Sequence, residues 1–353
     1  MHKQFLLKAL EQAWLGRGSC FPNPSVGAIA VQNNVIIAQA WHQGAGMPHA
    51  EKLLLDKIPK NSKGVSLYVT LEPCNHWGKT PPCVNAIINH GIDRVVYAFK
   101  DPNPVVAANN TPELLKKHKI DAIYCEVPEV TKFYESYQHW VINKTPWITA
   151  KIAQTFDGKI AGANSRPIKL SNDKCSEFTH LQRFHTDIIL TSAKTINIDN
   201  PSLNARFQGE IRKKHVAIID TRLEVNKEAW LFEKAECYHI FYDASLLKPK
   251  KFNNCRFHGV SAENGQLDLK KIIYHLGSMG YHDVWVEAGG GLFSSLHHAK
   301  LVNRTYIYLV PMVLGSSAVS AYRGENFLES FSKISWWAEE DNMIAAIDWD
   351  ISK

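Results

Sequence analysis

Short blocks of apolar and polar residues alternate between residues 26 and 126, and they predict a layered α/β domain. The runs VGAIAV and VIIAQAW have the pattern of two paired strands, with Asn33-Asn34 as the turn between them. Helical patterns follow at 49–57, 81–91 and 113–119, and strand patterns lie at 66–71, 93–99 and 121–125. Strands that alternate with helices in this way are typical of an α/β layer sandwich.

Two more helical patterns frame this series. The amino-terminal stretch MHKQFLLKALEQAWLGRG has apolar residues on one helical face, and an aromatic-rich helix is predicted over 129–144, ending before Pro146. Because a new α/β series begins at this proline, we expect two domains, 1–145 and 146–353. A chain of 353 residues is long enough for two separate cores.

The second series starts with a predicted hairpin. WITAKIA and GKIAG form its two arms, with Asp157-Gly158 at the turn. A helix is predicted over 267–280. Further strands are predicted at 187–192, 215–220, 237–243, 283–289 and 304–310.

Composition changes this picture little. With 45% hydrophobic and 21% charged residues, the chain has the composition of an ordinary globular protein. The net charge of +6 fits a nucleic-acid partner or small phosphorylated substrates, and it does not decide between them. No signal peptide and no apolar run of the ~20 residues that a bilayer requires is found. The seven cysteines are therefore expected in the reducing cytoplasm, as core residues, metal ligands or catalytic groups.

The most informative motif is HAE at 49–51, followed by two cysteines, Cys74 and Cys83. A structural zinc ion takes four protein ligands, whereas a catalytic one keeps a position open for water. His49, Cys74 and Cys83 supply three ligands and leave Glu51 to carry protons, as the corresponding residue does in zinc deaminases. Prolines favour helix starts at His49 and Cys83, where the helix dipole helps to hold a thiolate.

The spacing of the cysteines makes a family resemblance specific. Cytidine and tRNA adenosine deaminases have C-x-x-C at this point, but here eight residues separate Cys74 from Cys83, in the segment LEPCNHWGKTPPC. This pattern resembles the riboflavin-biosynthesis deaminase of the RibD family. PNPSVGAIAV, WHQGAGMPHAE and DPNP at 22–31, 41–51 and 101–104 resemble it too, and the likeness extends over almost the whole chain.

The resemblance implies a cytidine-deaminase-like three-layer domain that binds Zn²⁺ through His49, Cys74 and Cys83, with Glu51 as the general acid and base. It also implies a set of residues that hold the base or the ribose phosphate of the substrate. These residues are Asn23, His42, Lys79, Asp101 and Asn103.

The carboxyl-terminal half gives fewer clues without the resemblance. VEAGGGL at 286–292 is a strand, a glycine cluster and a predicted helix start, a junction that can present backbone N–H groups to a phosphate. It lacks the spaced glycines of dinucleotide-binding folds, so on the residues alone a glycine-rich turn stays an open alternative.

Further motifs resemble the reductase domain of the same family, which has a dihydrofolate-reductase-like fold and uses NADPH. They are KIAQTFDGKIA from Lys151 and the pattern T-x-x-x-D-x-P-x-L-x-x-R over 195–206. The resemblance implies cofactor contacts at Ala153, Thr195, Asp199, Gly289, Gly290 and Gly291, and Lys169 is a further candidate for a cofactor contact. It implies substrate contacts at Lys151, Arg183, Leu203, Arg206 and Glu287, where arginines suit a phosphate.

The sequence departs from the family at two places. After DPNP the usual glycines are replaced by VVAANN, where Asn110 can partly substitute because asparagine tolerates a positive φ. Near 167–171 the usual serine and tryptophan are Pro167 and Lys169, which puts the reductase activity in question; the lysine could meet the 2′-phosphate of NADPH.

The chain is thus expected to be bifunctional in riboflavin biosynthesis. It would deaminate 2,5-diamino-6-ribosylamino-4(3H)-pyrimidinone 5′-phosphate with zinc and then reduce the ribosyl to a ribityl chain with NADPH. No nucleic-acid or membrane partner is expected, and a homodimer through the reductase domain follows from the resemblance alone. The alternatives are a deaminase with a degenerate reductase domain, a nucleic-acid deaminase of the tRNA adenosine type, or a non-enzymatic protein whose zinc site His76 closes.

Overall fold

The computed structural model describes residues 1–77, 81–104, 110–247, 249–250, 254–323 and 331–350, without the side chain of Ser332. The chain divides into two compact units, Met1–Lys144 and Thr145–Lys353. Each is described by itself below. No helix among the described residues is both long and apolar enough to cross a membrane.

A five-stranded sheet forms the centre of the first unit, in the order β2-β1-β3-β4-β5. Its strands are β1 (Gly27–Gln32), β2 (Val35–Trp41), β3 (Val65–Leu71), β4 (Arg94–Phe99) and β5 (Asp121–Tyr124). β1 is antiparallel to both β2 and β3, whereas β3, β4 and β5 are parallel. The predicted turn joins β1 to β2, and Asn33 and Asn34 both have positive φ, which the tight turn of such a hairpin requires.

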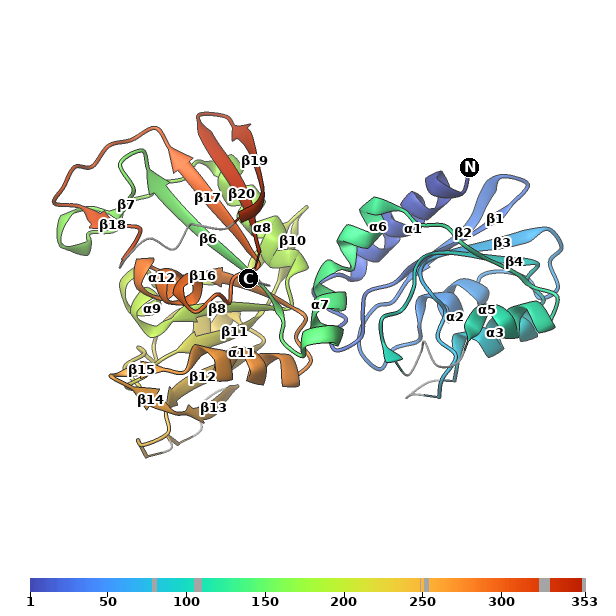
Figure 1. Cartoon of the computed structure of the whole chain (residues 1–353), viewed down its shortest axis with the longest axis horizontal. Helices are drawn as coiled ribbons and strands as arrows, with labels where there is room; N and C mark the ends of the chain where they lie inside the picture. Colours follow the sequence, from blue (N-terminus) through green and yellow to red (C-terminus); the bar gives the residue numbers. More distant parts are fainter. Residues whose placement is uncertain (78–80, 105–109, 248, 251–253, 324–330, 351–353) are drawn as a thin grey trace. The chain divides into compact units, whose positions relative to one another are not determined.

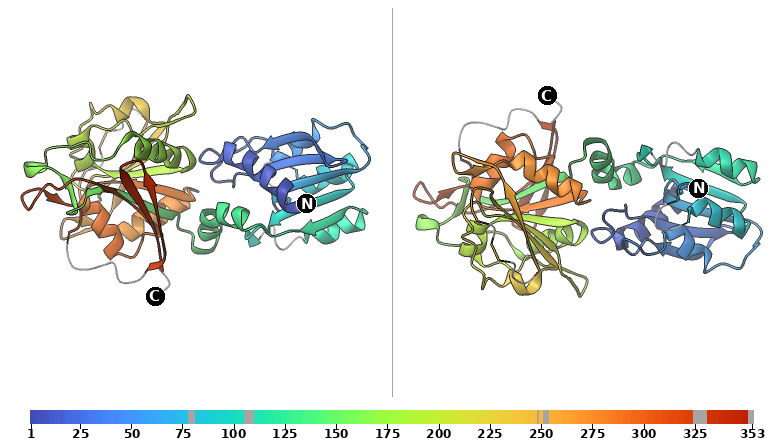
Figure 2. Two further views of the ribbon diagram at one scale, coloured as in Figure 1. Left: turned by 90° about the horizontal axis from the view of Figure 1, so that it is seen from above. Right: turned by 90° about the horizontal axis from the view of Figure 1, so that it is seen from below.

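Helices cover both faces of this sheet, which gives the expected three layers (Figure 1). α1 (His2–Gly16), α6 (Pro128–Phe133) and α7 (Glu135–Asn143) contribute to one apolar cluster. α2 (Ala50–Leu55), α3 (Cys83–His90) and α5 (Thr111–Lys117) pack on the opposite cluster. Figure 2 shows the two helical layers from above and from below. α1 approaches β1 so closely that a Cβ at Gly27 would lie 2.0 Å from the carbonyl oxygen of Ala9.

The aromatic-rich helix predicted over 129–144 is in fact two helices, because the chain bends at Tyr134. This residue has φ −91° and ψ 6° and is 1% exposed. Its hydroxyl donates to the carbonyl of Ser25 (2.9 Å) and contacts the hydroxyl of Thr70 (2.6 Å). The bend lets both Phe133 and Tyr134 enter the core, which two adjacent residues of a straight helix could not do equally.

The second unit is built on a nine-stranded sheet in the order β13-β12-β11-β8-β16-β6-β17-β20-β19. Strands β13 to β17 of this order are parallel, and β20 is antiparallel to both of its neighbours, β17 and β19. The strands are β6 (Trp147–Thr155), β8 (Ile188–Ser192), β11 (His215–Ile219), β12 (Cys237–Asp243), β13 (Cys255–Val260), β16 (Asp283–Glu287), β17 (Arg304–Val310), β19 (Phe331–Glu339) and β20 (Asn342–Trp349).

Shorter elements complete this unit. Its helices are α8 (Asp173–His185), α9 (Ala193–Asp199), α10 (Leu231–Lys234), α11 (Leu269–Ser278), α12 (Gly290–His298) and a 3-10 turn, η1 (Ala163–Ser165). The additional strands are β7 (Lys159–Ala161), β9 (Ala205–Phe207), β10 (Glu210–Arg212), β14 (Ala262–Glu263), β15 (Gln266–Leu267) and β18 (Val319–Ser320).

The predicted hairpin at the start of this unit is wrong, although its turn exists. Gly158 N donates to Thr155 O at the predicted turn. β6 pairs with β16 through residues 147–151 and with β17 through residues 149–155, and it has no ladder with β7. β7 pairs with β18 instead.

Candidate functional site

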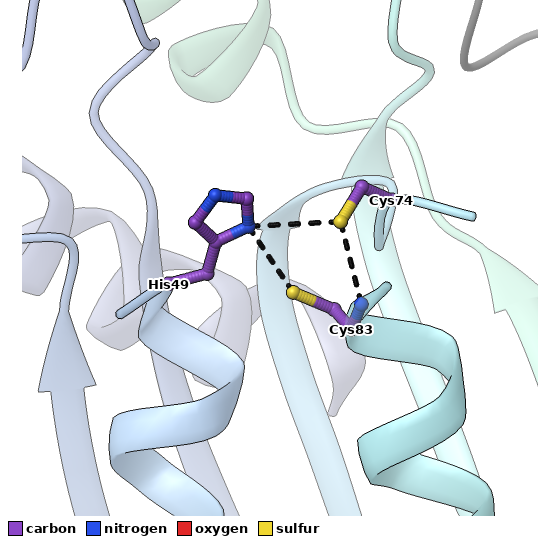
Figure 3. Close-up of side chains that lie close together, drawn as sticks. All are labelled: His49, Cys74 and Cys83. Atoms are coloured by element: carbon purple, nitrogen blue, oxygen red, sulfur yellow. Dashed lines mark hydrogen bonds between the residues drawn. The ribbon is translucent and has the colours of Figure 1, made fainter. Parts of the chain in front are cut away.

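Three metal-binding side chains of the first unit converge at one end of its sheet. His49 is the residue just before α2, Cys74 follows β3, and Cys83 is the first residue of α3. Figure 3 shows the three side chains pointing toward one another from these separate elements. The backbone N–H of Cys83 donates to the sulfur of Cys74 at 3.3 Å, so the start of α3 itself holds one ligand in place.

The donor set fits a zinc ion. His49 Nδ1 lies 3.2 Å from Cys83 Sγ and 3.6 Å from Cys74 Sγ, and the three ligand atoms lie within 4.8 Å of one another. One imidazole and two thiols are the mixed nitrogen and sulfur donors that zinc prefers. The hydrogen bond from Cys83 lowers the pKa of Cys74 to about 4 and raises the pKa of Cys83. Among the described residues, His76 is not in this cluster, so three ligands leave one position for water.

Glu51 lies beside the triad and is 4% exposed, on the first turn of α2. Its burial, followed by the negative charge on Cys74, raises the pKa of its carboxyl group to about 7. A carboxyl group with such a pKa can both accept and donate a proton near neutral pH, which is what a general acid and base requires.

A pocket of about 370 Å³ opens above the triad. Four of the five predicted substrate residues line it: Asn23, His42, Asp101 and Asn103. The fifth, Lys79, lies outside the described residues, as do the residues 105–109 after DPNP. Asn110 is described and has φ 38°, so asparagine does adopt the left-handed conformation there.

Hydrogen bonds fix the polar side chains of this pocket. His42 Nδ1 lies 3.1 Å from Pro48 O, and its Nε2 lies 3.3 Å from Asn23 Nδ2. Burial lowers the pKa of His42, so it is neutral near pH 7. It then donates to Pro48 and accepts from Asn23, which turns the Asn23 carbonyl oxygen away from His42. Asp101 accepts from the backbone N–H of Asn103 (2.9 Å) and from the Tyr137 hydroxyl (3.1 Å).

Two lining features were not predicted as parts of the site. Tyr137 and Trp140 on α7 form an aromatic wall, with ring centroids 6.3 Å apart and planes inclined by 30°. The aromatic-rich pattern of this helix was the available indication. His76 also lines the pocket, and its buried Nδ1 has no hydrogen-bond partner among the described residues. A substrate group that donates or accepts a hydrogen bond would satisfy that nitrogen.

The second unit contains a cleft formed by two adjoining pockets of about 310 and 350 Å³. The pockets share Thr195, Asp199 and Gly289, among other residues. The cleft lies at the carboxyl ends of β8 and β16 and beside the middle of β6. Predicted residues that line it are Lys151, Ala153, Lys169, Thr195, Asp199, Glu287, Gly289, Gly290 and Gly291.

The glycine loop of the cleft leaves space for a ligand backbone or phosphate. Gly289 precedes α12, and its N–H donates to the Thr195 hydroxyl. A Cβ at Gly289 or Gly291 would meet no protein atom within 4 Å, so both face open space. A Cβ at Gly290 would instead lie 2.5 Å from Ala321 O. A helix start with uncovered backbone is a suitable cradle for the pyrophosphate of a dinucleotide.

Three residues expected at the reductase substrate lie outside the lining of this cleft. Arg183 does not line the cleft, and it binds Glu287 through two contacts of 2.5 and 2.8 Å. Leu203 is 2% exposed in the apolar core, with φ 45°. The guanidinium group of Arg206 donates to His180 Nε2.

The two residues that depart from the family pattern, Pro167 and Lys169, both line the cleft. Lys169 is largely exposed and pairs with Asp173 at 2.8 Å, one turn further along the chain. Pro167 lines the neighbouring pocket. Binding of NADPH by Lys169 stays a prediction.

Comparisons with known proteins match each of the two units to a known protein domain. The cytidine and deoxycytidylate deaminase zinc-binding region matches residues 1–99, and the RibD C-terminal domain matches residues 146–344. Riboflavin biosynthesis protein RibD of Buchnera aphidicola is 31% identical over 348 residues, which is 94% of this chain and 91% of that protein. The protein of the same name from Aquifex aeolicus is 31% identical over 340 residues, 94% of this chain and 93% of its own.

Solved structures are similar over the full length. A diaminohydroxyphosphoribosylaminopyrimidine deaminase/5-amino-6-(5-phosphoribosylamino)uracil reductase from Thermotoga maritima has a TM-score of 0.87 at 28% identity and 99% coverage of both chains. RibD of Acinetobacter baumannii has a TM-score of 0.85 with the same coverage, and at 24% identity it supports the fold alone.

Proposed function

The chain belongs to the RibD family of riboflavin-biosynthesis enzymes, and we propose that its two units catalyse two successive steps on one phosphorylated pyrimidine. The first unit is a zinc-dependent deaminase, and the second is an NADPH-dependent reductase. The proposed substrate is 2,5-diamino-6-ribosylamino-4(3H)-pyrimidinone 5′-phosphate. The observation that carries the deaminase assignment is the three-ligand triad with a buried carboxyl group beside it.

The residues of the first unit divide the deamination between them. His49, Cys74 and Cys83 would hold the zinc ion, whose positive charge would favour the loss of a proton from water at neutral pH. Glu51 would take this proton as the water oxygen bonds to the amine-bearing ring carbon. It would then protonate the leaving amine, so that the carbon–nitrogen bond breaks, ammonia departs and a carbonyl group remains. Because this unit accepts a planar ring, the Tyr137–Trp140 wall would stack against the pyrimidine.

The polar residues of the pocket would orient the same substrate. The Asn23 carbonyl can accept from an exocyclic amine, since His42 already occupies the amide nitrogen. The unpartnered His76 nitrogen offers a further hydrogen bond. Lys79 is proposed for the ribose phosphate, as a flexible positive charge.

The cleft of the second unit would hold NADPH, which would supply the hydride for reduction of the opened ribosyl chain. The Gly289–Gly291 loop would hold its phosphates, and Thr195 and Asp199 line the adjoining part of the cleft. Lys151 and Glu287 face the same cleft and would bind the substrate. Arg183 then acts through Glu287, which it holds by a bidentate ion pair.

We propose that the protein acts in the cytoplasm, which the chemistry of its cysteines supports. Separately, we propose a homodimer through the second unit. All seven cysteines are free thiols, the form that a reducing compartment maintains. Light scattering of the purified chain measures the oligomeric state, and a monomer would contradict the dimer.

Replacing Glu51 by glutamine tests the deaminase directly. We expect Glu51→Gln to lose at least about 100-fold in deamination rate, because general acid–base catalysis contributes on this order. Zinc content should stay unchanged, since Glu51 is not a ligand. Glu126→Gln, an exposed carboxylate of the same unit, is the control and should keep full activity. Full deamination by Glu51→Gln would contradict the role given to Glu51. No deamination by the unmodified zinc-loaded chain would favour the non-enzymatic alternative, and saturable binding of tRNA in a gel-shift assay would favour a nucleic-acid deaminase.

A further inference from the structure

A second group of metal-binding side chains lies in the Thr145–Lys353 unit, away from the reductase cleft. His215 and Cys237 are the first residues of β11 and β12, and His239 lies two residues further along β12. The cleft is built at the carboxyl ends of β8 and β16, whereas this cluster lies at the amino-terminal part of β11 and β12 (Figure 1). Neither the RibD resemblance nor the proposed reaction uses these residues.

Strand register brings the three side chains onto one face of the sheet. β11 and β12 are parallel, and His215 pairs directly with Cys237. His239 follows Cys237 by two positions, and side chains two apart on a strand point to the same face. As a result, one nitrogen or sulfur atom from each of the three residues lies within 4.8 Å of the others. The arrangement follows from the backbone, so it does not depend on long flexible side chains.

The hydroxyl of Tyr281 marks the point on which the two imidazoles converge. It lies 2.8 Å from His215 Nδ1 and 3.0 Å from His239 Nε2. Cys237 Sγ lies 3.8 Å from the same His239 nitrogen. Two nitrogens, one sulfur and one phenolic oxygen thus surround a single small region, and Cys237, His239 and Tyr281 are buried.

A second layer of histidines orients the His239 ring. His239 Nδ1 lies 3.0 Å from His258 Nε2, and His258 Nδ1 lies 3.0 Å from His275 Nε2. When His239 donates its Nδ1 proton to His258, its Nε2 presents a lone pair toward His215 and Cys237. A metal-binding histidine almost always has its other ring nitrogen held by such a partner.

We propose that His215, Cys237 and His239 form a second metal site, which takes a borderline-soft divalent ion of the Zn²⁺ class. Two imidazoles and one thiolate are ligands for zinc and similar ions, and they do not suit Mg²⁺ or Ca²⁺. The Tyr281 hydroxyl lies where it can occupy or cover the fourth position. The ion would cross-link β11, β12 and Tyr281, which lies in the segment before β16. Its role would therefore be structural. This site does not depend on the proposed function.

The number of zinc ions per full-length chain tests the proposal. The chain is stripped of metal with a chelator, titrated with Zn²⁺ in competition with a chromophoric chelator, and analysed by elemental mass spectrometry after gel filtration. We expect two zinc ions per chain in the unmodified protein and one in Cys237→Ala. The double variant Cys74→Ser/Cys83→Ser should also keep one, because it loses only the deaminase ion.

Two further variants separate loss of the site from loss of the fold. His215→Gln replaces a half-buried ligand and should also bind one zinc ion. Cys255→Ala is the matched control on the adjacent strand, since Cys255 is buried but is not in the cluster, and it should keep two. In Co²⁺-loaded Cys74→Ser/Cys83→Ser, a thiolate-to-cobalt absorption band should appear, and it should vanish when Cys237→Ala is added. One zinc ion in the unmodified chain, or two in both Cys237→Ala and His215→Gln, would overturn the proposal.

Discussion

Adjacent residues of one motif can have different roles, and Gly290 and Gly291 are an example. One is needed for packing, and the other leaves space in the cleft. Gly290 is required by packing, because its Cα faces the backbone of Ala321. Gly291 faces open space in the cleft and is not needed for packing. Neighbouring residues of one sequence motif are thus expected to respond differently to the same substitution.

Alanine substitutions at these positions test this separation. Gly290→Ala should lower the free energy of unfolding by about 1–3 kcal/mol, since the new methyl group would overlap Ala321. Gly291→Ala should leave stability within about 0.5 kcal/mol, and it should raise the Kd for NADPH because the methyl group occupies the phosphate cradle. Chemical denaturation and NADPH titration measure the two effects. Equal stability of both variants would contradict the role given to Gly290.

The Arg183–Glu287 ion pair predicts a pH dependence. Burial alone would raise the pKa of Glu287, but the charge and hydrogen bonds of Arg183 outweigh it and lower the pKa to about 2. A lowered pKa contributes stability above the ordinary value near 4.5, and this stability is lost as the pH falls toward 2. Glu287→Gln should therefore be less stable than the unmodified chain by about 3 kcal/mol at pH 7 and by only about 1 kcal/mol at pH 3.

Denaturant titrations of the second unit at both pH values measure this difference. Glu228→Gln, which removes an exposed carboxylate in the same unit, serves as the control and should leave the unfolding free energy unchanged at pH 7. A difference for Glu287→Gln that does not shrink on acidification would contradict the ion-pair account.

At the scale of elements, α7 supplies a wall of the deaminase pocket from a segment more than 50 residues beyond Cys83. Trp140→Ala should lower kcat/KM for deamination by about tenfold, because aromatic stacking on a base contributes about 1–3 kcal/mol. Zinc content should not change. Trp230→Ala, an exposed tryptophan in the other unit, is the control. Steady-state kinetics that show no loss for Trp140→Ala would remove α7 from the substrate site.

Local patterns predicted most elements, but they did not determine how the elements pair. The spacing of apolar residues located α1, and Asn33-Asn34 located the first hairpin. The same reasoning predicted the turn at Asp157-Gly158 correctly, but the pairing of β6 with β7 was wrong. The partners of β6 are residues 283–287 and 304–310. Pairing over such distances depends on sheet order, which short-range patterns do not contain.

The candidate site could be predicted from the sequence to a similar extent. The metal triad follows from ligand chemistry and spacing, and the structure brings the three residues together. Tyr137, Trp140 and His76 were not predicted to line the substrate pocket, because only the fold brings them there. Arg183 and Arg206 were expected at a phosphate, but their side chains engage Glu287 and His180.

At the scale of the whole molecule, the chain combines two sites whose reactions are independent in chemistry. In the proposed mechanism, deamination uses the triad and Glu51 of the first unit, whereas reduction uses the cleft of the second. Glu51→Gln should therefore abolish deamination and still bind NADPH with an unchanged Kd. Fluorescence titration with NADPH measures this, and a large change in Kd would mean that the units are energetically coupled.

The most direct test of the bifunctional assignment is mass spectrometry of the product formed from the diaminopyrimidine phosphate by the zinc-loaded chain. Without NADPH, we predict exchange of one amine for oxygen. With NADPH, the product should in addition gain two hydrogens on the ribosyl chain. Deamination without reduction would mean that the segment with Pro167 and Lys169 has cost the second unit its activity. No change in either condition would contradict the assignment.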